Sequence, residues 1–257
     1  EGNNTAAGLF GNFNGQLRNY YSIHLNGEWD PQTVNTRRTR GGPRTLNPAG
    51  QRIFTEISSD DRRSVVFAVS GGVGGFGGRF WEIGTGIEWK PATQVSLSFE
   101  PSLERNLNTS QYVTTADDPG ATATFGRRYV FADLQQTTLS GSFRINWIFS
   151  PRLSLELYAQ PLVSSGNYRG YKELARPKSY DFNRYGQNGS TITPVTDSKG
   201  VVQEYTVDPT GAGTSTFAVP NLDFSFASLR GNAVLRWEYV TGSTLYLVWT
   251  QDRSDFE

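Results

Sequence analysis

Hydrophobic and polar residues alternate strictly along several long runs of the chain, and a two-residue period is typical of strands with one apolar face. Between positions 139 and 149 the odd positions carry Leu, Gly, Phe, Ile, Trp and Phe, whereas the even positions carry Ser, Arg, Asn and one Ile. Runs at 153–163, 229–239 and 17–29 repeat this arrangement. Helical periodicity is scarce, so we expect an all-β protein.

The pattern predicts ten strands. Their expected bounds are near 5–17, 20–29, 51–58, 63–72, 79–90, 93–104, 130–149, 152–165, 223–240 and 243–253. Short turns with Pro, Gly, Asn or Asp follow the first, third, fifth, seventh and ninth strands. Longer polar connections at about 30–50, 71–78, 105–128 and 166–222 alternate with these turns. In an up-and-down meander, all the short turns then lie at one end and all the long loops at the other.

This asymmetry is typical of outer-membrane barrels, which have short periplasmic turns and longer extracellular loops. Several runs reach the ~9–11 residues that a tilted membrane-spanning strand needs, whereas sandwich strands usually have ~5–6. We therefore expect an antiparallel up-and-down transmembrane β-barrel. Residues 1–257 would form one domain, or part of a larger barrel, with the loops at about 30–50, 105–128 and 166–222 on the extracellular side. A soluble β-sandwich, which also alternates, remains the structural alternative.

Aromatic residues beside the short turns fit this expectation, because amphipathic rings mark the membrane interface. We expect this role for Trp89, Trp147, Trp237 and Tyr239. The polar sides of the strands would face a watery lumen, since lipid penalises a midplane Arg by ~2–4 kcal/mol. The expected lumen-facing residues are His24, Arg144, Glu156, Arg230, Arg236 and Glu238.

Composition narrows the function further. The chain has 24 Lys+Arg, 24 Asp+Glu, no Cys and no Met. The absence of cysteine excludes disulfides, thiolate metal sites and thiol nucleophiles, and zero net charge argues against a nucleic-acid partner. No apolar run approaches the ~18 residues of a membrane-spanning helix, and no signal peptide opens the chain. The missing initiator Met and the ending at Phe256-Glu257 suggest a piece of a longer protein.

Candidate catalytic motifs are weak. Residues 72–77 match GxGxxG, but strands surround them where a dinucleotide site needs a helix, so we expect a flexible glycine connection. His24 is the only histidine, and the acid pairs 60–61 and 117–118 fall in expected turns or loops, where such acids are usually solvated. Residues 208–213 have a calcium-turn skeleton, yet Thr210 and Ala212 replace the expected acids. We assign no catalytic, cofactor-binding or metal-ligating residue.

The connection at 166–222 is long enough to serve a function, because ordered loops above ~15 residues usually do. Its tyrosines Tyr171, Tyr180 and Tyr185 could stack on sugars as ligand contacts. Self-packing of the loop explains them equally well.

Several segments resemble one family. They lie at 111–115, 126–134, 151–161, 172–175 and 228–249, and include the run Ser228-Leu229-Arg230-Gly231-Asn232-Ala233-Val234-Leu235-Arg236-Trp237-Glu238-Tyr239. These are similar to the C-terminal outer-membrane β-barrel of an uncharacterised bacterial family whose N-terminal module is carbohydrate-binding family-nine-like. The resemblance covers most of residues 100–253. It implies a Gram-negative outer-membrane location and a sugar-binding-like module outside this chain. Because the family has no established reaction, no catalytic residue transfers.

Our first functional hypothesis is an outer-membrane barrel that serves as a pore, uptake route or surface anchor linked to glycan handling. Its partners would be outer-membrane lipid, a glycan or other small polar solute, and further segments or subunits that complete the assembly. The alternatives are a soluble all-β carbohydrate-binding protein and an outer-membrane hydrolase that uses loop carboxylates such as Asp117 and Asp118.

Overall fold

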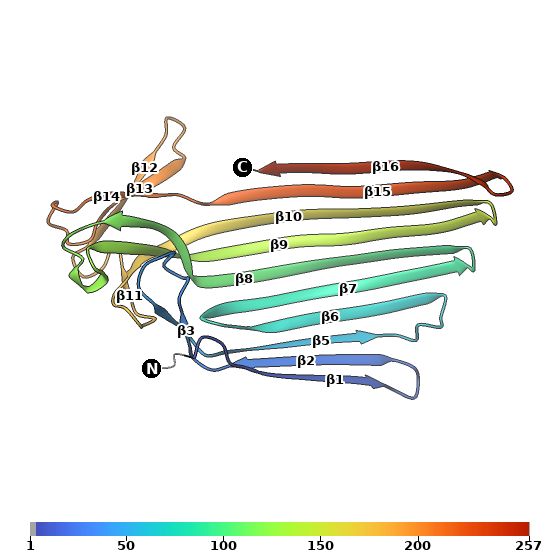
Figure 1. The fold of residues 1–257 in the computed structure, drawn as a ribbon, viewed down its shortest axis with the longest axis horizontal. Helices are drawn as coiled ribbons and strands as arrows, with labels where there is room; N and C mark the ends of the chain where they lie inside the picture. The colour runs from blue at the N-terminus through green and yellow to red at the C-terminus, as the bar shows by residue number, and fades with distance from the viewer. Residues whose placement is uncertain (1–3, 257) are drawn as a thin grey trace.

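The computed structural model describes residues 4–256 and is built almost wholly of antiparallel strands (Figure 1). Ten of the strands form one up-and-down meander in chain order. They are β1 (Leu9–Gln16), β2 (Ser22–Asp30), β5 (Gly50–Ser58), β6 (Val65–Gly75), β7 (Gly78–Ala92), β8 (Val95–Asp117), β9 (Arg127–Ser150), β10 (Leu153–Leu174), β15 (Phe224–Val240) and β16 (Ser243–Phe256). The expected all-β antiparallel class and the ten strands are confirmed.

The turns and loops are arranged as the alternation predicts. Figure 1 shows the short turns after β1, β5, β7, β9 and β15 at one end of the sheet and the long connections at the other. The sheet is open, however, because within residues 4–256 β1 pairs only with β2, and β16 only with β15. The expected closure into a barrel is therefore not formed by the described residues.

Two expected loops are more ordered than the sequence suggested. The stretch at 105–128 is mostly strand, since β8 runs to Asp117 and β9 starts at Arg127, with a 3-10 turn at Thr122–Thr124 between them. The glycines at 71–75 belong to β6 and pair with β5 and β7, so only residues 76–77 form the turn. Neither stretch shows the two-residue period, because the apolar residues of the β8 extension do not alternate with polar ones and the glycines of β6 carry no side chain.

The remaining two loops contain small sheets. The loop at 30–50 holds a hairpin of β3 (Thr33–Asn35) and β4 (Thr45–Asn47). The loop at 166–222 first extends β10, then forms β11 (Phe182–Arg184), which pairs with β10. It ends in a three-stranded sheet of β12 (Thr191–Thr196), β13 (Val202–Asp208) and β14 (Phe217–Pro220).

The two faces of the meander differ sharply in polarity. Directly paired residues share a face, and one such row reads Val95, Trp147, Leu155, Leu235 and Leu247 across five strands. A row of the other face reads Ser98, Arg144, Tyr158, Asn232 and Thr250. Odd-numbered positions thus build an apolar face and even-numbered positions a polar face.

The apolar face is exposed. Large side chains on it that are more than one-third exposed are Leu9, Phe13, Leu25, Trp29, Ile53, Ile57, Phe67, Val69, Val73, Trp81, Ile83, Ile87, Trp89, Phe99, Leu139, Trp147, Phe149, Val163, Leu229, Trp237, Tyr239, Leu245, Leu247 and Trp249. The main contacts of the meander strands are with their paired neighbours, and among residues 4–256 no second layer covers their apolar face. Leu155, Leu235 and Phe143 are only partly buried. The exposed apolar exceptions on the polar face, such as Phe10 and Val248, lie on the edge strands or beside turns.

The buried core lies at the loop end, in a unit we call the cap. The cap comprises residues 109–117 of β8, 127–134 of β9 and 168–174 of β10, together with the connections 31–49, 118–126 and 175–223. Every buried apolar side chain of the described residues belongs to it: Val113, Ala121, Tyr129, Val130, Phe131, Ala132, Leu134, Tyr168, Tyr171, Leu174, Tyr185, Val207 and Val219. The meander itself therefore has no core of its own. Within residues 4–256 we find no helix with the length and apolarity to cross a membrane.

Candidate functional site

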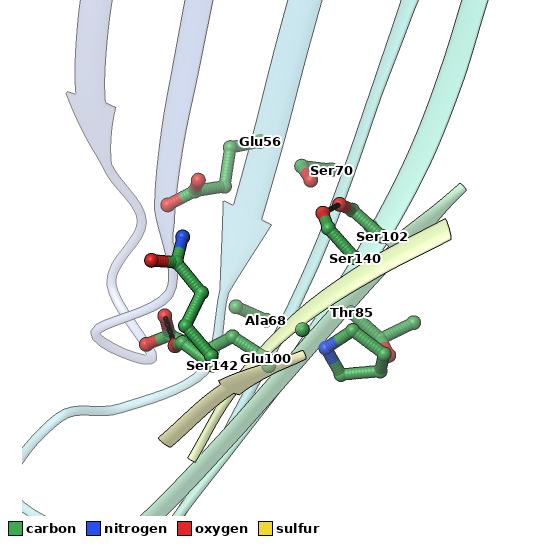
Figure 2. A pocket seen from close by; sticks show the side chains of 13 residues that line it. Glu56, Ala68, Ser70, Thr85, Glu100, Ser102, Ser140 and Ser142 are labelled. Atoms are coloured by element: carbon green, nitrogen blue, oxygen red, sulfur yellow. Dashed lines mark hydrogen bonds between the residues drawn. The ribbon is translucent and has the colours of Figure 1, made fainter. Parts of the chain in front are cut away.

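A hollow of about 420 Å³ lies in the middle of the polar face, between β5 and β10 (Figure 2). Its floor is low because small residues follow one another there, among them Ala68, Gly84, Gly86 and Gly141. Figure 2 shows the carboxylates of Glu56 and Glu100 and a group of serine hydroxyls around it. The hollow is thus lined by hydrogen-bonding groups suited to water or to a polar solute.

Few of these polar groups form hydrogen bonds or ion pairs with other side chains. The Ser142 hydroxyl donates a hydrogen bond to the Glu100 Oε2 at 2.9 Å, and the hydroxyls of Ser102 and Ser140 lie 2.7 Å apart. Among the described residues Glu56 forms no ion pair within 4.0 Å. A carboxylate without a cation needs water around it, because burying it alone costs several kcal/mol. The hollow is therefore a hydrated surface.

Charge is unevenly distributed over the polar face. Its glutamates on β5, β7 and β8 are Glu56, Glu82, Glu88, Glu100 and Glu104, whereas its arginines on β9 and β15 are Arg144, Arg230 and Arg236. Glu82 and Glu104 lie directly opposite each other in the β7–β8 pairing. Like charges in this position repel one another, which is tolerable only where water screens them. The part of the face on β5 to β8 is thus mainly acidic, whereas on β9 to β16 the arginines are matched in number by Glu156, Glu238 and Asp252.

The six residues expected to face a lumen all lie on this polar face. The His24 Nδ1 is 2.6 Å from the Asn14 Oδ1, and the Arg144 guanidinium lies 4.9 Å from the centre of the Tyr158 ring. Arg230 forms a long ion pair of 3.7 Å with Asp252. Glu156 and Arg236 occupy even positions on β10 and β15, and the Glu238 Oε1 accepts the Gly242 N–H at 3.0 Å. The structure spreads these residues over the sheet and does not gather them into one catalytic cluster.

The four aromatic residues expected at a membrane interface lie on the apolar face beside the short turns. Trp89, Trp147, Trp237 and Tyr239 are between 44 and 55% exposed. The Trp147 ring stacks on Phe149 with ring centres 4.5 Å apart. They form a row of half-exposed rings along one rim of the sheet, as the sequence predicts.

Arg128 holds the cap together through a buried ionic network. Its Nε donates to the Asp118 Oδ2 at 2.6 Å and its Nη1 to both Glu173 oxygens at 2.6 and 2.7 Å. Hydrogen bonding from Arg128 lowers the pKa of Asp118. Burial raises the pKa of Tyr185, so its hydroxyl stays protonated and donates to the Glu173 Oε2. The network joins the ends of β8, β9 and β10 to the loop that follows β11.

The tyrosines expected to contact a ligand are mostly packing residues. Tyr171 and Tyr185 are 4 and 8% exposed and belong to the cap core, so self-packing describes them and ligand contact does not. The Tyr171 hydroxyl has no hydrogen-bond partner among the described residues. Tyr180 is partly buried, and its hydroxyl donates to the Gly77 carbonyl at 3.2 Å. The aromatic content of the loop was the correct signal for a packed unit, but not for a sugar platform.

The acid pairs are only half solvated, which corrects the sequence expectation. Asp61 and Asp117 are exposed, but Asp60 and Asp118 are buried beneath arginines. The Arg62 side chain donates to Asp60 at 2.8 and 2.9 Å and lowers the pKa of that carboxyl to about 2. Both buried acids are therefore ionised structural anchors at neutral pH, and neither can serve as a general acid.

The turn at 208–213 is also structural. The Asp208 carboxylate accepts backbone N–H groups from Thr210, Gly211 and Gly213 at 2.7 to 3.1 Å, and the Gly213 bond is the main cause of its lowered pKa. Among the described residues no three His, Asp or Glu side chains converge as metal ligands.

The placement of the β3–β4 hairpin was not predicted in the sequence analysis. The hairpin is bound to the loop after β10, since the Leu46 N–H donates to the Ser179 carbonyl at 3.0 Å and the Lys178 N–H to the Arg44 carbonyl at 2.6 Å. Arg38 of the hairpin contacts the Ser110 hydroxyl on β8. The available signal was the arginine-rich run at 37–44, whose charges need acceptors. The hairpin thus lies over the loop end of the polar face.

No protein-family model matches this chain, and a search of curated proteins finds no match. The functional proposal below is therefore argued from the structure and the sequence.

Proposed function

We propose that this chain is an outer-membrane β-barrel protein, or the greater part of one, of a Gram-negative bacterium. Its apolar face contacts lipid, its polar face lines an aqueous lumen, and the cap stands at the extracellular mouth. The barrel serves as a pore, an uptake route for small polar solutes or a surface anchor linked to glycan handling. The glycan link rests on the family resemblance of residues 100–253.

The supporting observation is the uncovered apolar face. Soluble monomers rarely expose contiguous apolar patches above a few hundred Å², whereas this face continues across ten strands. The apolar positions of β10 run from 153 to 163. At ~3.4 Å per residue and a tilt of ~40°, they span about 26 Å. This height equals the ~25 Å apolar band of outer-membrane barrels.

The proposal requires that the free edges of β1 and β16 be paired in the membrane. Lipid offers no hydrogen-bond partner to an open sheet edge, so a spanning sheet must close. β1 runs toward the short turns and β16 away from them (Figure 1). Their directions allow antiparallel pairing with each other or with an even number of additional strands. Further segments or subunits that supply such strands belong to the proposed assembly.

Extraction and gel migration test the proposal. The protein should enter the membrane fraction, require detergent for extraction, and migrate faster on SDS gels before boiling than after. A protein that stays monodisperse without detergent and shows no heat-dependent migration would contradict it and favour the soluble carbohydrate-binding alternative. No observation favours the hydrolase alternative, because Asp118 is held by Arg128 and Asp117 by Arg127 at 2.9 Å.

A further inference from the structure

A second hollow, of about 240 Å³, lies at the loop end of the polar face where the β3–β4 hairpin meets β5–β8. Three arginines contribute to its lining, Arg38, Arg52 and Arg79, of which Arg79 occupies an odd position of β7 and so belongs to the apolar face. No Asp or Glu lines it, although carboxylates dominate the neighbouring part of the face. The hollow therefore has a net positive lining with no internal counter-charge.

Arg38 is held in place by neutral groups alone. Its Nε donates to the Thr45 hydroxyl at 3.1 Å, its Nη1 to the Ser110 hydroxyl and its Nη2 to the Asn47 Oδ1 at 2.7 Å, and its Cζ lies 5.0 Å from the Tyr180 ring centre. Among residues 4–256 it forms no ion pair within 4.0 Å. A partly buried guanidinium with no carboxylate partner is costly for the fold. Its orientation is fixed but its charge is left uncompensated.

Arg52 is likewise a guanidinium without a carboxylate partner, but aromatic rings contact it instead of hydroxyl and amide groups. Its cross-strand neighbour on β2 is Glu28, yet the two side chains form no ion pair within 4.0 Å. The guanidinium instead lies over two aromatic rings of the hollow, 4.8 Å from the centre of Phe80 and 5.8 Å from that of Phe76. Cation–π contacts orient a guanidinium through its face and leave its N–H edge available to an acceptor.

We propose that this hollow is a binding site for the carboxylate or phosphate group of a small polar molecule. Guanidinium groups present parallel N–H donors that match the paired oxygens of either anion. The volume equals that of about eight waters at ~30 Å³ each, which is room for the anionic group and a short polar body. Asn106 adds an amide to the lining. The site is assembled by the fold of this chain, so binding does not depend on the proposed membrane location.

Calorimetry on the purified chain at constant ionic strength tests the site, with glucuronate, inorganic phosphate and neutral glucose as probes. We expect glucuronate, phosphate or both to bind, and glucose to bind at least about tenfold more weakly. Binding of glucuronate alone identifies a carboxylate ligand, and binding of phosphate alone a phosphate ligand. If neither anion binds, or if glucose binds equally well, the proposal is overturned.

Variants locate the binding in the hollow. Arg52 is exposed, so Arg52→Gln should preserve the fold and weaken anion binding by about tenfold or more. Arg38→Gln should weaken anion binding similarly. Arg38→Lys is a second variant at this position, which keeps the positive charge but loses the paired N–H donors of the guanidinium. Arg152→Gln removes the same charge from a turn at the far end of the sheet and should bind normally. Equal weakening by Arg52→Gln and Arg152→Gln would refute the site. Heat-dependent migration of each variant, measured in parallel, reports on the proposed membrane function separately.

Discussion

Two arginine substitutions, one on each face of the same strand, distinguish a lipid-facing surface from a water-facing one. Ile145 of β9 lies on the apolar face and pairs with Leu97 and Leu157, whereas Asn146 lies on the polar face and pairs with Ser96 and Glu156. Ile145 is five residues from the end of β9 at Ser150. At ~3.4 Å per residue and ~40° tilt this places it about 13 Å inside the turn rim, near the middle of a ~25 Å band.

Ile145→Arg should therefore destabilise the protein in lipid by the midplane penalty of ~2–4 kcal/mol, which is a roughly 30- to 900-fold change in the folding equilibrium. Asn146→Arg should change it little, because its side chain enters water beside the Glu156 carboxylate. Urea titration in lipid vesicles, read by the fraction of fast-migrating unboiled protein, measures both. If Ile145→Arg is no more destabilising than Asn146→Arg, the assignment of the two faces is wrong.

Three further predictions concern the cap and the aromatic rim. Arg128→Met leaves the buried Asp118 and Glu173 carboxylates without a cation and should destabilise the cap by about 3–5 kcal/mol. Limited proteolysis should then cleave the cap. Tryptophan emission should stay unchanged, because all the tryptophans lie on the meander strands. Because the folded-state pKa of Asp118 is lowered from 3.8, its contribution to cap stability is full above that pH and declines below it; protease sensitivity of the cap that is flat from pH 7 to pH 2 would contradict this. Trp89, Trp147 and Trp237 should be quenched more strongly by lipids brominated near the headgroup than by lipids brominated near the chain end, and an absence of quenching by either would argue against an interface role.

The meander could be predicted from the sequence because its physics is local. Alternation at 139–149 and 153–163 fixes which residues share a face, and the turn residues at 150–152 fix the connection. The cap could not be predicted in the same way. Its strands at 109–117 and 127–134 are covered on both faces or irregular in register, so their apolar residues do not alternate with polar ones. Its hairpin depends on contacts of Arg38 with residues about 70 or more positions away.

The candidate sites follow the same division. Even positions on alternating runs identified the polar face and its charged residues correctly. The anion-binding hollow was missed because it joins the 31–49 connection to residues of four strands, β5 to β8, and no single segment contains its pattern. The tyrosines at 171 and 185 were ambiguous because an aromatic residue signals burial and ligand stacking equally, and only their position in the cap core decides between them.

A nitroxide scan along β10 tests the central claim most directly. The chain has no cysteine, so each Cys substitution from position 153 to 163 gives a single labelling site. In lipid vesicles, labels at odd positions should be relaxed by oxygen and shielded from a water-soluble nickel reagent, and labels at even positions should show the reverse. A scan in which odd and even positions respond alike, or in which the nickel reagent reaches the odd positions, would contradict a lipid-facing surface.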